Sequence, residues 1–282
     1  MGDAMNRLNL DNRRLIIHLL IEGMSIEATS RVTGASTNTI VKLLEDVGAE
    51  CSTYMFLHMV KLPCVRIQAD EIWAFIKMKE KRVPDGLKGL LGYGDTYTWV
   101  ALCPDTKLVP CFLVGRRDAE HANQFMDDLA WRLPHRIQLS TDAYAAYPEA
   151  VERAFGGRAE FGMVKKSYGG ERTYRDGTKK RCRPTECSGT TKVVVCGNPD
   201  LDRISTSHVE RQNLSMRMAM RRYTRKTNGF SKKHWNHHAA TALYFMYYNF
   251  ARIHQTIRVT PAMEAGLAKS PWSVEDIVRL AA

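Results

Sequence analysis

The spacing of the apolar residues changes near residue 65, and this change most limits the folds that the chain can adopt. Before it, apolar side chains recur as on one face of a helix, at i, i+3, i+4 and i+7: Ile40, Leu43, Leu44 and Val47. After it, they alternate with polar residues as on a strand: Val65, Ile67 and Ala69 against Arg66, Gln68 and Asp70. The change predicts a helical domain over 1–60, a sheet-forming domain over 61–270 and a tail over 271–282.

The second segment predicts a mixed sheet with helices on its faces. Two apolar runs, 96–103 and 107–115, are joined by the turn residues Pro-Asp-Thr and are expected to form an antiparallel hairpin. A helix over 118–133, a short strand over 136–142 and a second helix from about 143 to 155 follow. A hairpin followed by helical crossovers predicts an α/β fold in which the first and fourth strands can be neighbours.

Three acidic residues, far apart in the sequence, fall where these elements can bring them together. Asp70 lies on the first strand, Asp142 just past the fourth, and Glu210 in the first turn of a later helix. Buried carboxylates repel one another, and a divalent cation removes that conflict. Oxygen ligands suit Mg²⁺, and two metal ions can activate the attacking oxygen and stabilise the leaving oxygen in phosphodiester chemistry. The three acids are therefore candidate ligands of a two-metal site.

Two of these acids have structural alternatives, which the sequence leaves open. Asp142 could cap the helix expected at 143. Glu210 could close a capping box with Ser207, where its helix is expected to start. On that helix Arg217 lies seven residues on and shares the face of Glu210, and Arg221 continues the stripe. Basic residues beside a carboxylate would suit a site that holds a DNA backbone.

The charge and the cysteines limit the partners and the compartment. Lys and Arg total 41 against 30 Asp and Glu, a formal net charge of +11, which favours nucleic acid as a partner. The seven cysteines are scattered and lack the Cys-x2-Cys spacing of zinc ribbons, and no signal peptide precedes them. The apolar run 15–21 is too short to cross a bilayer. We expect reduced thiols in a cytoplasmic protein, associated with the nucleoid when DNA is bound, and no membrane partner.

The first sixty residues predict three helices in a helix-turn-helix arrangement. The first is expected from Asp11, as its N-cap, to Glu22, while Ser25 and Ser36 cap the next two and Gly34 permits the turn between them. In this motif the start of the last helix enters the major groove. Here that start carries small polar residues and a lysine: Thr37, Asn38, Thr39 and Lys42. A helical bundle used for packing or dimerisation would have the same spacing.

A basic segment at about 165–200 precedes the Glu210 helix. Turn residues predict a loop, inserted in the domain, whose cations bind phosphate without reading sequence: Lys165, Lys166, Lys179, Lys180 and Arg181. A solvated loop is the alternative. A long helix is expected from His234 to His254, with its histidines at 234, 237 and 238 on one polar face rather than on a metal.

Three motifs resemble the acidic blocks of known transposases. They are "DEIW" (70–73), "TDAYAAY" (141–147) and "HVERQNLSMR…RRYTRKTNGFSKK" (208–233), and the segment "YNFARIHQTIRVTPAMEAGL" resembles the end of such catalytic domains. The likeness, over about 65–266, is to the insertion sequence 1 family of the ribonuclease-H-like DDE superfamily. It implies a ribonuclease-H-like sheet flanked by helices, Asp70, Asp142 and Glu210 as catalytic residues and metal ligands, and Arg217 as the basic residue after the Glu.

The resemblance also implies an activity and its partners. Such a transposase binds the terminal inverted repeats of its element, cleaves a DNA strand and joins it to target DNA, using two Mg²⁺ ions, with Mn²⁺ as a substitute. It acts as a homo-oligomer, at least a dimer, because two ends are processed together. Cys51 and Cys64 do not form the cysteine-rich zinc element of some members. A non-catalytic DNA-binding regulator and a ribonuclease-H-like nuclease without strand transfer are the alternative functions.

Overall fold

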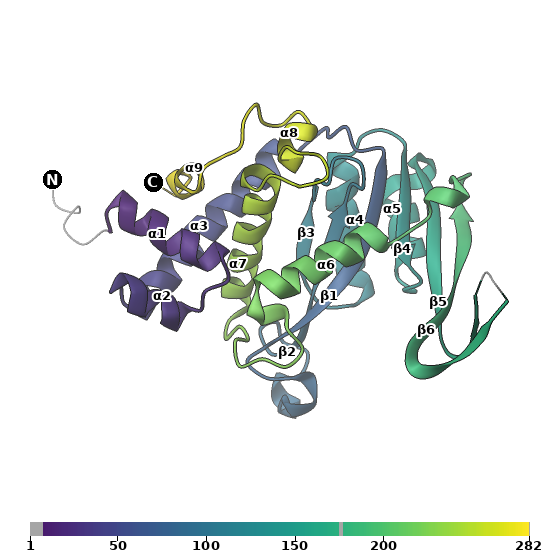
Figure 1. The fold of residues 1–282 in the computed structure, drawn as a ribbon, viewed down its shortest axis with the longest axis horizontal. Coiled ribbons are helices and arrows are strands. Elements are labelled where there is room, and N and C mark those ends of the chain that lie inside the picture. Colours follow the sequence, from purple (N-terminus) through teal and green to yellow (C-terminus); the bar gives the residue numbers. More distant parts are fainter. Residues whose placement is uncertain (1–7, 175–176, 282) are drawn as a thin grey trace.

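Three helices form one end of the molecule in the computed structural model, which describes residues 8–174 and 177–281 (Figure 1). They are α1 (Leu10–Ile21), α2 (Ile26–Thr33) and α3 (Thr37–His58). The predicted caps of α2 and α3 are confirmed, because the Ser25 and Ser36 side chains accept from backbone amides of their first turns. The first helix begins earlier than predicted, and Asn9 caps it in place of Asp11. Residues 1–7, 175–176 and 282, which belong to the predicted helical domain, basic insertion and tail, lie outside the described part.

Helix α3 packs along α7 (His234–Met246), which continues as a π-helical turn, Tyr247–Ala251. Gly48 allows this contact, because a Cβ atom there would lie 2.6 Å from the Cα of Ala239. One hydrophobic cluster runs from α1 and α3 through the sheet to α7 and α9 (Val274–Arg279). The helical segment and the sheet therefore share a core, and the boundary at residue 60 stays a prediction.

The histidines of α7 do not form the expected polar face. His237 is fully buried, and its Nδ1 lies 2.9 Å from Ser231 Oγ. Burial, and then the nearby Arg222, lowers the pKa of His237 well below its usual value. His238 is also largely enclosed, beside Ser52 of α3. The expectation was wrong because α7 is covered by α3 on one side and the sheet on the other.

The sheet has six strands in the order β3-β2-β1-β4-β5-β6. Their bounds are β1 Arg66–Ile76, β2 Gly94–Leu102, β3 Phe112–Gly115, β4 Ile137–Asp142, β5 Ala159–Thr173 and β6 Lys179–Cys196. Strands β1, β4 and β5 run parallel to one another, and the other pairs are antiparallel. The predicted hairpin of β2 and β3 is confirmed, and so is the pairing of the first and fourth strands.

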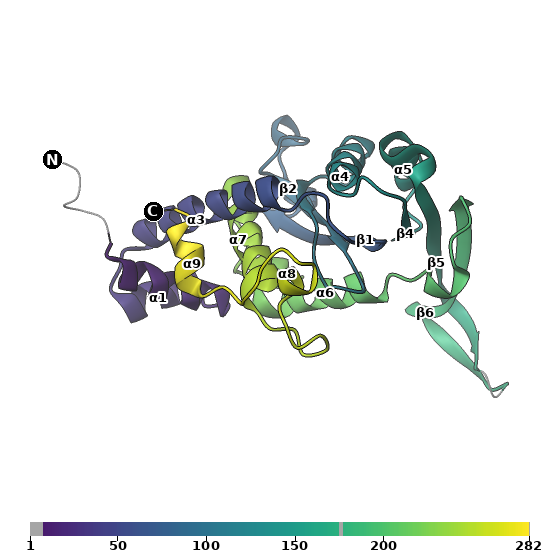
Figure 2. The same cartoon turned by 90° about the horizontal axis from the view of Figure 1, so that it is seen from above.

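Helices cover both faces of this sheet (Figure 2). Helices α4 (Ala119–Arg132) and α5 (Tyr147–Phe155) lie on one face, and α6 (Ser207–Ala219) and α8 (Pro261–Glu264) on the other. Short 3₁₀ turns occur at Glu80–Arg82, Asp85–Leu87, Gly156–Arg158, Leu201–Arg203 and Arg221–Tyr223. The turn between α1 and α2 abuts the end of α6, since a Cβ on Gly23 would lie 2.5 Å from the carbonyl oxygen of Ala219.

The basic segment at 165–200 is not a loop. Strands β5 and β6 pair antiparallel as far as Thr173 and Lys179, and the outer part of this hairpin projects from the body of the molecule (Figure 2). Most of its side chains beyond Lys165 are exposed on both faces. We call residues 165–174 and 177–192 the arm. The strands were not predicted because apolar and polar residues do not alternate along them. Gly169 and Gly170 at positive φ and the shifts of register also interrupt the regular pairing.

Two further expectations concern reduced cysteines and the absence of a membrane-spanning helix. All seven cysteines carry free thiols in the structure, and five of them are buried. Among residues 8–174 and 177–281, no helix has both the length and the apolar composition that crossing a bilayer requires.

Candidate functional site

The site lies where β4 stops before its neighbours do. Asp142 is the last residue of this six-residue strand, whereas β1 runs on to Ile76 and β5 to Thr173. In the parallel pairing Ala69 is opposite Thr141, so Asp70 and Asp142 come next to each other on adjacent strands. The short strand thus leaves a notch in the sheet, and Asp142 forms its base.

A third carboxylate, which the sequence reasoning missed, joins them. Oxygen atoms of Asp70, Glu71 and Asp142 all lie within 4.8 Å of one another. Successive residues of a strand face opposite sides of a sheet, so Asp70 and Glu71 point to different faces. Asp142 can meet both because it stands at a strand end. The only sequence signal for Glu71 was its place beside Asp70, and alternation argued against it.

Asp70 faces α6. Its Oδ2 accepts a hydrogen bond of 2.9 Å from Asn213 Nδ2. Burial raises the pKa of Asp70 to about 6, and the nearby Asp142 carboxylate adds to the effect. The Glu210 carboxylate adds a smaller contribution to this rise in the pKa of Asp70. Among the described residues, however, Glu210 is not one of the acids whose oxygen atoms lie within 4.8 Å of one another.

Glu71 faces α4 and α5 and is almost completely enclosed. Its side chain is 2% exposed, Tyr147 Oη donates to Oε1, and Arg117 Nε donates to Oε2 at 2.9 Å. Burial raises the pKa of Glu71 to about 7, followed by the effect of Asp142. Arg117 also reaches Asp142, with 3.3 Å between Nη2 and Oδ2. One guanidinium therefore bridges two carboxylates.

Asp142 has a local role too, though not the predicted one. Its Oδ1 accepts from the backbone N–H of Tyr144 at 3.1 Å. Helix α5 begins at Tyr147, not at 143, because a turn intervenes, and Asp142 is not its N-cap. The other oxygen, Oδ2, is directed to Arg117. Turn formation thus fixes the carboxylate without using all of its acceptors.

Glu210 is held by neighbours other than those of a capping box. Helix α6 starts at Ser207 with Thr206 as the N-cap residue, and Glu210 Oε1 accepts from the Thr206 hydroxyl. Lys166 of β5 donates to the same oxygen at 2.6 Å. Although burial lowers the pKa of Lys166, its bond to Glu210 raises it above the usual value. The capping-box alternative is wrong, since no side chain caps the helix in the described structure.

The face of α6 toward Asp70 carries two polar atoms without partners. Asn213 is 2% exposed, and its Oδ1 accepts no hydrogen bond from the residues that the structure describes. Within the same residues the buried Nε of Arg217 also makes no hydrogen bond. Asn213 and Arg217 are four residues apart on one helix face and offer one acceptor and one donor beside the acids. A buried polar pair of this kind needs a ligand or water.

The donor set fits a hard divalent cation. Carboxylate oxygens are the ligands that Mg²⁺ and Mn²⁺ take, and the cluster keeps several acids close in spite of their repulsion. Asp70, Asp142 and the newly found Glu71 are the residues that could hold such an ion, whereas Glu210, the predicted third ligand, is not part of this cluster in the described structure. The unpaired oxygen of Asn213 would be one more acceptor available to a ligand of this site.

The predicted DNA-contacting residues lie in three places. At the start of α3, Asn38, Thr39 and Lys42 are exposed and Thr37 is partly covered. On the arm, four cations are exposed to solvent: Lys165, Lys179, Lys180 and Arg181. Lys166 instead turns to Glu210. Arg221 is exposed but lies beyond the end of α6 at Ala219, so it does not continue the helical stripe.

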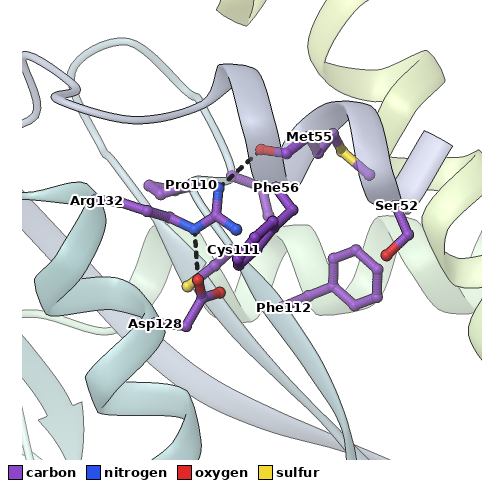
Figure 3. Close-up of a pocket in the computed structure, with 9 residues that line it drawn as sticks. Ser52, Met55, Phe56, Pro110, Cys111, Phe112, Asp128 and Arg132 are labelled. Atoms are coloured by element: carbon purple, nitrogen blue, oxygen red, sulfur yellow. Dashed lines mark hydrogen bonds and ion pairs between the residues drawn. The ribbon is translucent and has the colours of Figure 1, made fainter. Parts of the chain in front are cut away.

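A separate small cavity of about 140 Å³ lies between α3, α4 and the residues that lead into β3 (Figure 3). Arg132 crosses it, donating to Asp128 at 2.9 Å and to the backbone carbonyl oxygen of Met55 at 2.8 Å. Phe56 and Phe112 line the rest of the space. The cavity shares no residue with the acidic cluster. Its polar groups are satisfied within the protein, so Arg132 acts as a structural tie between α3 and α4.

Comparison with known proteins gives only remote similarity. No family model and no curated protein matches the sequence. Among solved structures, the chain resembles the "Mos1 transposase paired-end complex with left transposon end" over 57% of its length, with 11% identity and a TM-score of 0.21. It spans 60% of that Mos1 chain. It also resembles the "piggyBac transposase synaptic complex with hairpin DNA" over its whole length and 72% of that chain, with 10% identity and a TM-score of 0.43. Overall likeness at these values identifies no function, and the assignment must come from side chains.

Proposed function

We propose that this protein is a DDE transposase that cleaves and joins DNA strands with divalent metal ions. The observation that carries the proposal is the convergence of Asp70 and Asp142 within one cluster of oxygen atoms. Glu210 lies on α6, the helix that contacts Asp70 through Asn213. The motifs around these residues are those that resemble the insertion sequence 1 family, in which we place the chain. The sheet order, with parallel β1, β4 and β5, is consistent with a ribonuclease-H-like fold.

The acids would hold two Mg²⁺ ions, for which Mn²⁺ can substitute. When bound, the ions activate the attacking oxygen and stabilise the leaving oxygen of a phosphodiester. Asp70 and Asp142 act from adjacent strands, and Glu210 acts from α6, where Lys166 and Thr206 hold its carboxylate. Asn213 orients Asp70 through its Nδ2 donor. The enclosed Glu71 is a further ligand candidate.

The chain's own groups also suit the reacting hydroxyl. In strand cleavage the oxygen of water attacks phosphorus and the bond to the 3′-oxygen breaks. In strand transfer the oxygen of that freed 3′-hydroxyl attacks the phosphorus of a target phosphodiester, and the bond from this phosphorus to the target's own 3′-oxygen breaks, so that a new target 3′-hydroxyl is released. Arg217 Nε and Asn213 Oδ1 offer a donor and an acceptor to a hydroxyl or phosphate oxygen next to Asp70. Both steps can use the same arrangement, so no covalent link between protein and DNA is needed.

DNA binding would involve both ends of the molecule. We propose that residues 1–60 form a helix-turn-helix domain that reads the terminal inverted repeats through Asn38, Thr39 and Lys42, with Thr37 beside them. The arm would bind phosphates, as would Arg217 and Arg221 near the acids. The active assembly is at least a dimer, because two element ends must be processed together, and it works on the nucleoid.

One experiment tests the proposal directly. Purified protein is incubated with end-labelled duplexes taken from the DNA on either side of its gene, with Mg²⁺ or with EDTA. We expect Mg²⁺-dependent nicking that Asp142→Asn lowers by at least about 10³-fold, because metal stabilisation of the transition state amounts to several kcal/mol. Asp127→Asn, an exposed aspartate on α4, is the matched control and should cut normally.

The outcomes separate the rival functions. Equal cutting by the wild type and Asp142→Asn would remove the proposed role of Asp142. Binding of the duplexes without any cutting would favour a non-catalytic regulator. Cutting that never yields joined products when target DNA is added would favour a nuclease without strand transfer.

A further inference from the structure

A cleft of about 390 Å³ opens beside the acidic cluster. It is lined mainly by three tyrosines and two arginines, namely Tyr93, Tyr97, Tyr144, Arg116 and Arg117, with Glu80, Gly89 and Asp95 completing the wall. The residues come from β2, the loop before it, the segment that joins β3 to α4, and the turn after β4. Aromatic faces next to guanidinium groups are the combination by which proteins hold unpaired nucleotides.

Arg117 joins this cleft to the acids. Its guanidinium pairs with Glu71 and Asp142, and its backbone carbonyl oxygen accepts from Tyr144 Oη at 2.9 Å. Tyr97 lies on the same face of the sheet as Glu71, because it is two residues from Trp99, the partner of Glu71 in the pairing of β1 with β2. A DNA strand whose phosphate lies at the acids would therefore have its neighbouring nucleotide at the mouth of the cleft.

The three tyrosine rings differ in what covers them. The Arg117 guanidinium lies 4.0 Å from the centre of the Tyr144 ring. The Lys77 ammonium lies 3.8 Å from the centre of the Tyr93 ring and donates to its hydroxyl. Across residues 8–174 and 177–281, Tyr97 takes part in no ring stacking, cation–π contact or side-chain hydrogen bond. Its ring is thus the surface left for a base to stack on.

Arg116 supplies a cation on the cleft wall. In the described part of the chain its guanidinium makes no hydrogen bond or ion pair, although Asp118 is close enough for Arg116 to contribute to lowering its pKa. The guanidinium lies against Gly89, where an added Cβ would be 3.7 Å from Nη2. A guanidinium that no carboxylate neutralises is free to bind phosphate bidentately.

The opposite wall is acidic. Asp95 Oδ1 accepts from the backbone N–H of Glu80 at 3.2 Å, and Glu80 Oε2 accepts from that of Asp95 at 3.1 Å. These two bonds fix the carboxylates and leave other oxygen acceptors for amino groups on the edge of a base. Cation, aromatic surface and acceptors thus follow one another around a cleft large enough for a small ligand.

We propose that this cleft binds one nucleotide of the DNA strand, turned out of the base stack next to the phosphate held at the acids. The base stacks on Tyr97, its phosphate meets Arg116, and its amino edge faces Glu80 and Asp95. This inference rests on the proposed transposase function and adds to it a subsite for an unpaired nucleotide. Stacking on an aromatic side chain offsets part of the free energy that is needed to extrude the base from the duplex.

Binding experiments in EDTA, where no strand is cut, test the subsite. The probes are a duplex with a single-stranded 3′ overhang that carries 2-aminopurine and the blunt duplex of the same paired sequence. We expect the wild type to bind the overhang probe about tenfold more tightly, given the stacking energy of one base. Tyr97→Leu and Arg116→Gln should lose this preference and keep the affinity for blunt duplex. Tyr97→Phe, which keeps the ring, should retain the preference and the quenching of 2-aminopurine.

Each other outcome counts against the subsite. Equal affinity of the wild type for the two probes would overturn it, as would a preference that survives Tyr97→Leu. Deoxyadenosine monophosphate that competes as well as the overhang would show a site for free nucleotides instead. Failure of the proposed function is distinguishable, because it appears as absent Mg²⁺-dependent cutting while the Tyr97-dependent preference persists. If the subsite fails, cutting that depends on Asp142 remains.

Discussion

Arg117 Nε lies 2.9 Å from Glu71 Oε2, and this contact neutralises a carboxylate that is 2% exposed in the centre of the protein. The same guanidinium reaches Asp142 on the next strand. Because Arg117 itself is 35% exposed, water shares in stabilising its charge, whereas the side-chain partners of the Glu71 carboxylate among residues 8–174 and 177–281 are Arg117 and the Tyr147 hydroxyl. The ion pair therefore stabilises the charge of the Glu71 carboxylate more than that of the Arg117 guanidinium.

This asymmetry predicts the result of a double-mutant cycle. Arg117→Gln should lower the free energy of unfolding by about 1–3 kcal/mol, since it leaves Glu71 buried and unpaired. Glu71→Gln should cost less, and the double variant should be more stable than Arg117→Gln alone. Urea denaturation in EDTA measures all four proteins. Strictly additive effects would show that the two side chains do not stabilise each other.

The raised pKa of Asp70 predicts how stability depends on pH. A carboxyl group with a folded-state pKa of about 6, above its usual 3.8, binds more protons folded than unfolded between these values. Its ionisation therefore destabilises the metal-free protein as pH rises through about 6. Asp70→Asn should be more stable than the wild type at pH 8 in EDTA, with the advantage shrinking toward pH 5. Thermal denaturation of both proteins across this range, with Asp127→Asn as control, measures it, and a constant difference would contradict the assignment.

The close approach of α3 to α7 at Gly48 predicts that a larger residue there destabilises the protein. A Cβ at this position would lie 2.5–2.6 Å from backbone and side-chain atoms of Ala239, and the backbone atoms cannot rotate away. We expect Gly48→Ala to lower the free energy of unfolding by about 1–3 kcal/mol, as overpacking does. Gly86→Ala, where a Cβ meets nothing within 4 Å, is the matched control. If the two variants were equally stable, the helices would be free to move apart.

The arm predicts a change in the salt dependence of DNA binding. Among the described residues, Lys179 and Lys180 form ion pairs with exposed carboxylates 3.8 Å away, which are weak, so both lysines are available to phosphates along with Arg181. Replacing all three by Gln should weaken binding of any duplex and reduce the slope of log K against log salt by up to about 3. Thermal stability should not change, because these side chains are exposed. An unaltered slope would exclude the arm from the DNA interface.

The start of α3 predicts sequence-dependent effects instead. Asn38 and Lys42 are exposed on the first two turns, and neither belongs to the apolar face. Asn38→Ala should weaken binding to an element end by about 1–3 kcal/mol if it contacts a base, and should weaken random duplex much less. Asn12→Ala, at an exposed asparagine on α1, is the matched control. Equal losses on both DNAs would place this helix on the backbone or away from DNA.

Many of the helices and strands could be predicted, because the spacing of apolar residues and the capping residues within each short segment indicate them. The strand alternation around Ile67, the hairpin of β2 and β3 and the caps Ser25 and Ser36 each depend on residues close together in the chain. The arm did not follow, because both of its faces are exposed and no apolar alternation marks it. The burial of His237 could not be predicted either, because α3 and the sheet cover this side of α7, and both are distant in the sequence.

The candidate site was predictable only in part. Asp70 and Asp142 could be paired because neighbouring strands of a sheet place residues from distant parts of the sequence side by side, and the structure puts both in one cluster. Glu71 and Arg117 could not, because their contact joins β1 to the segment before α4, 46 residues away in the sequence. The role of Asn213 could not be predicted from its own helix, because its hydrogen-bond acceptor, Asp70, lies on β1.

Because β4 ends at the catalytic candidate Asp142, the arm and β4 should differ in how well they tolerate inserted residues. Residues added in pairs to the outer parts of β5 and β6 would lengthen an antiparallel ladder whose described side chains are mostly exposed. A single residue added between Ile137 and Asp142 would reverse the side of the sheet on which the last carboxylate emerges. Relatives of this protein should therefore vary freely in arm length while keeping the span of β4 constant to the residue.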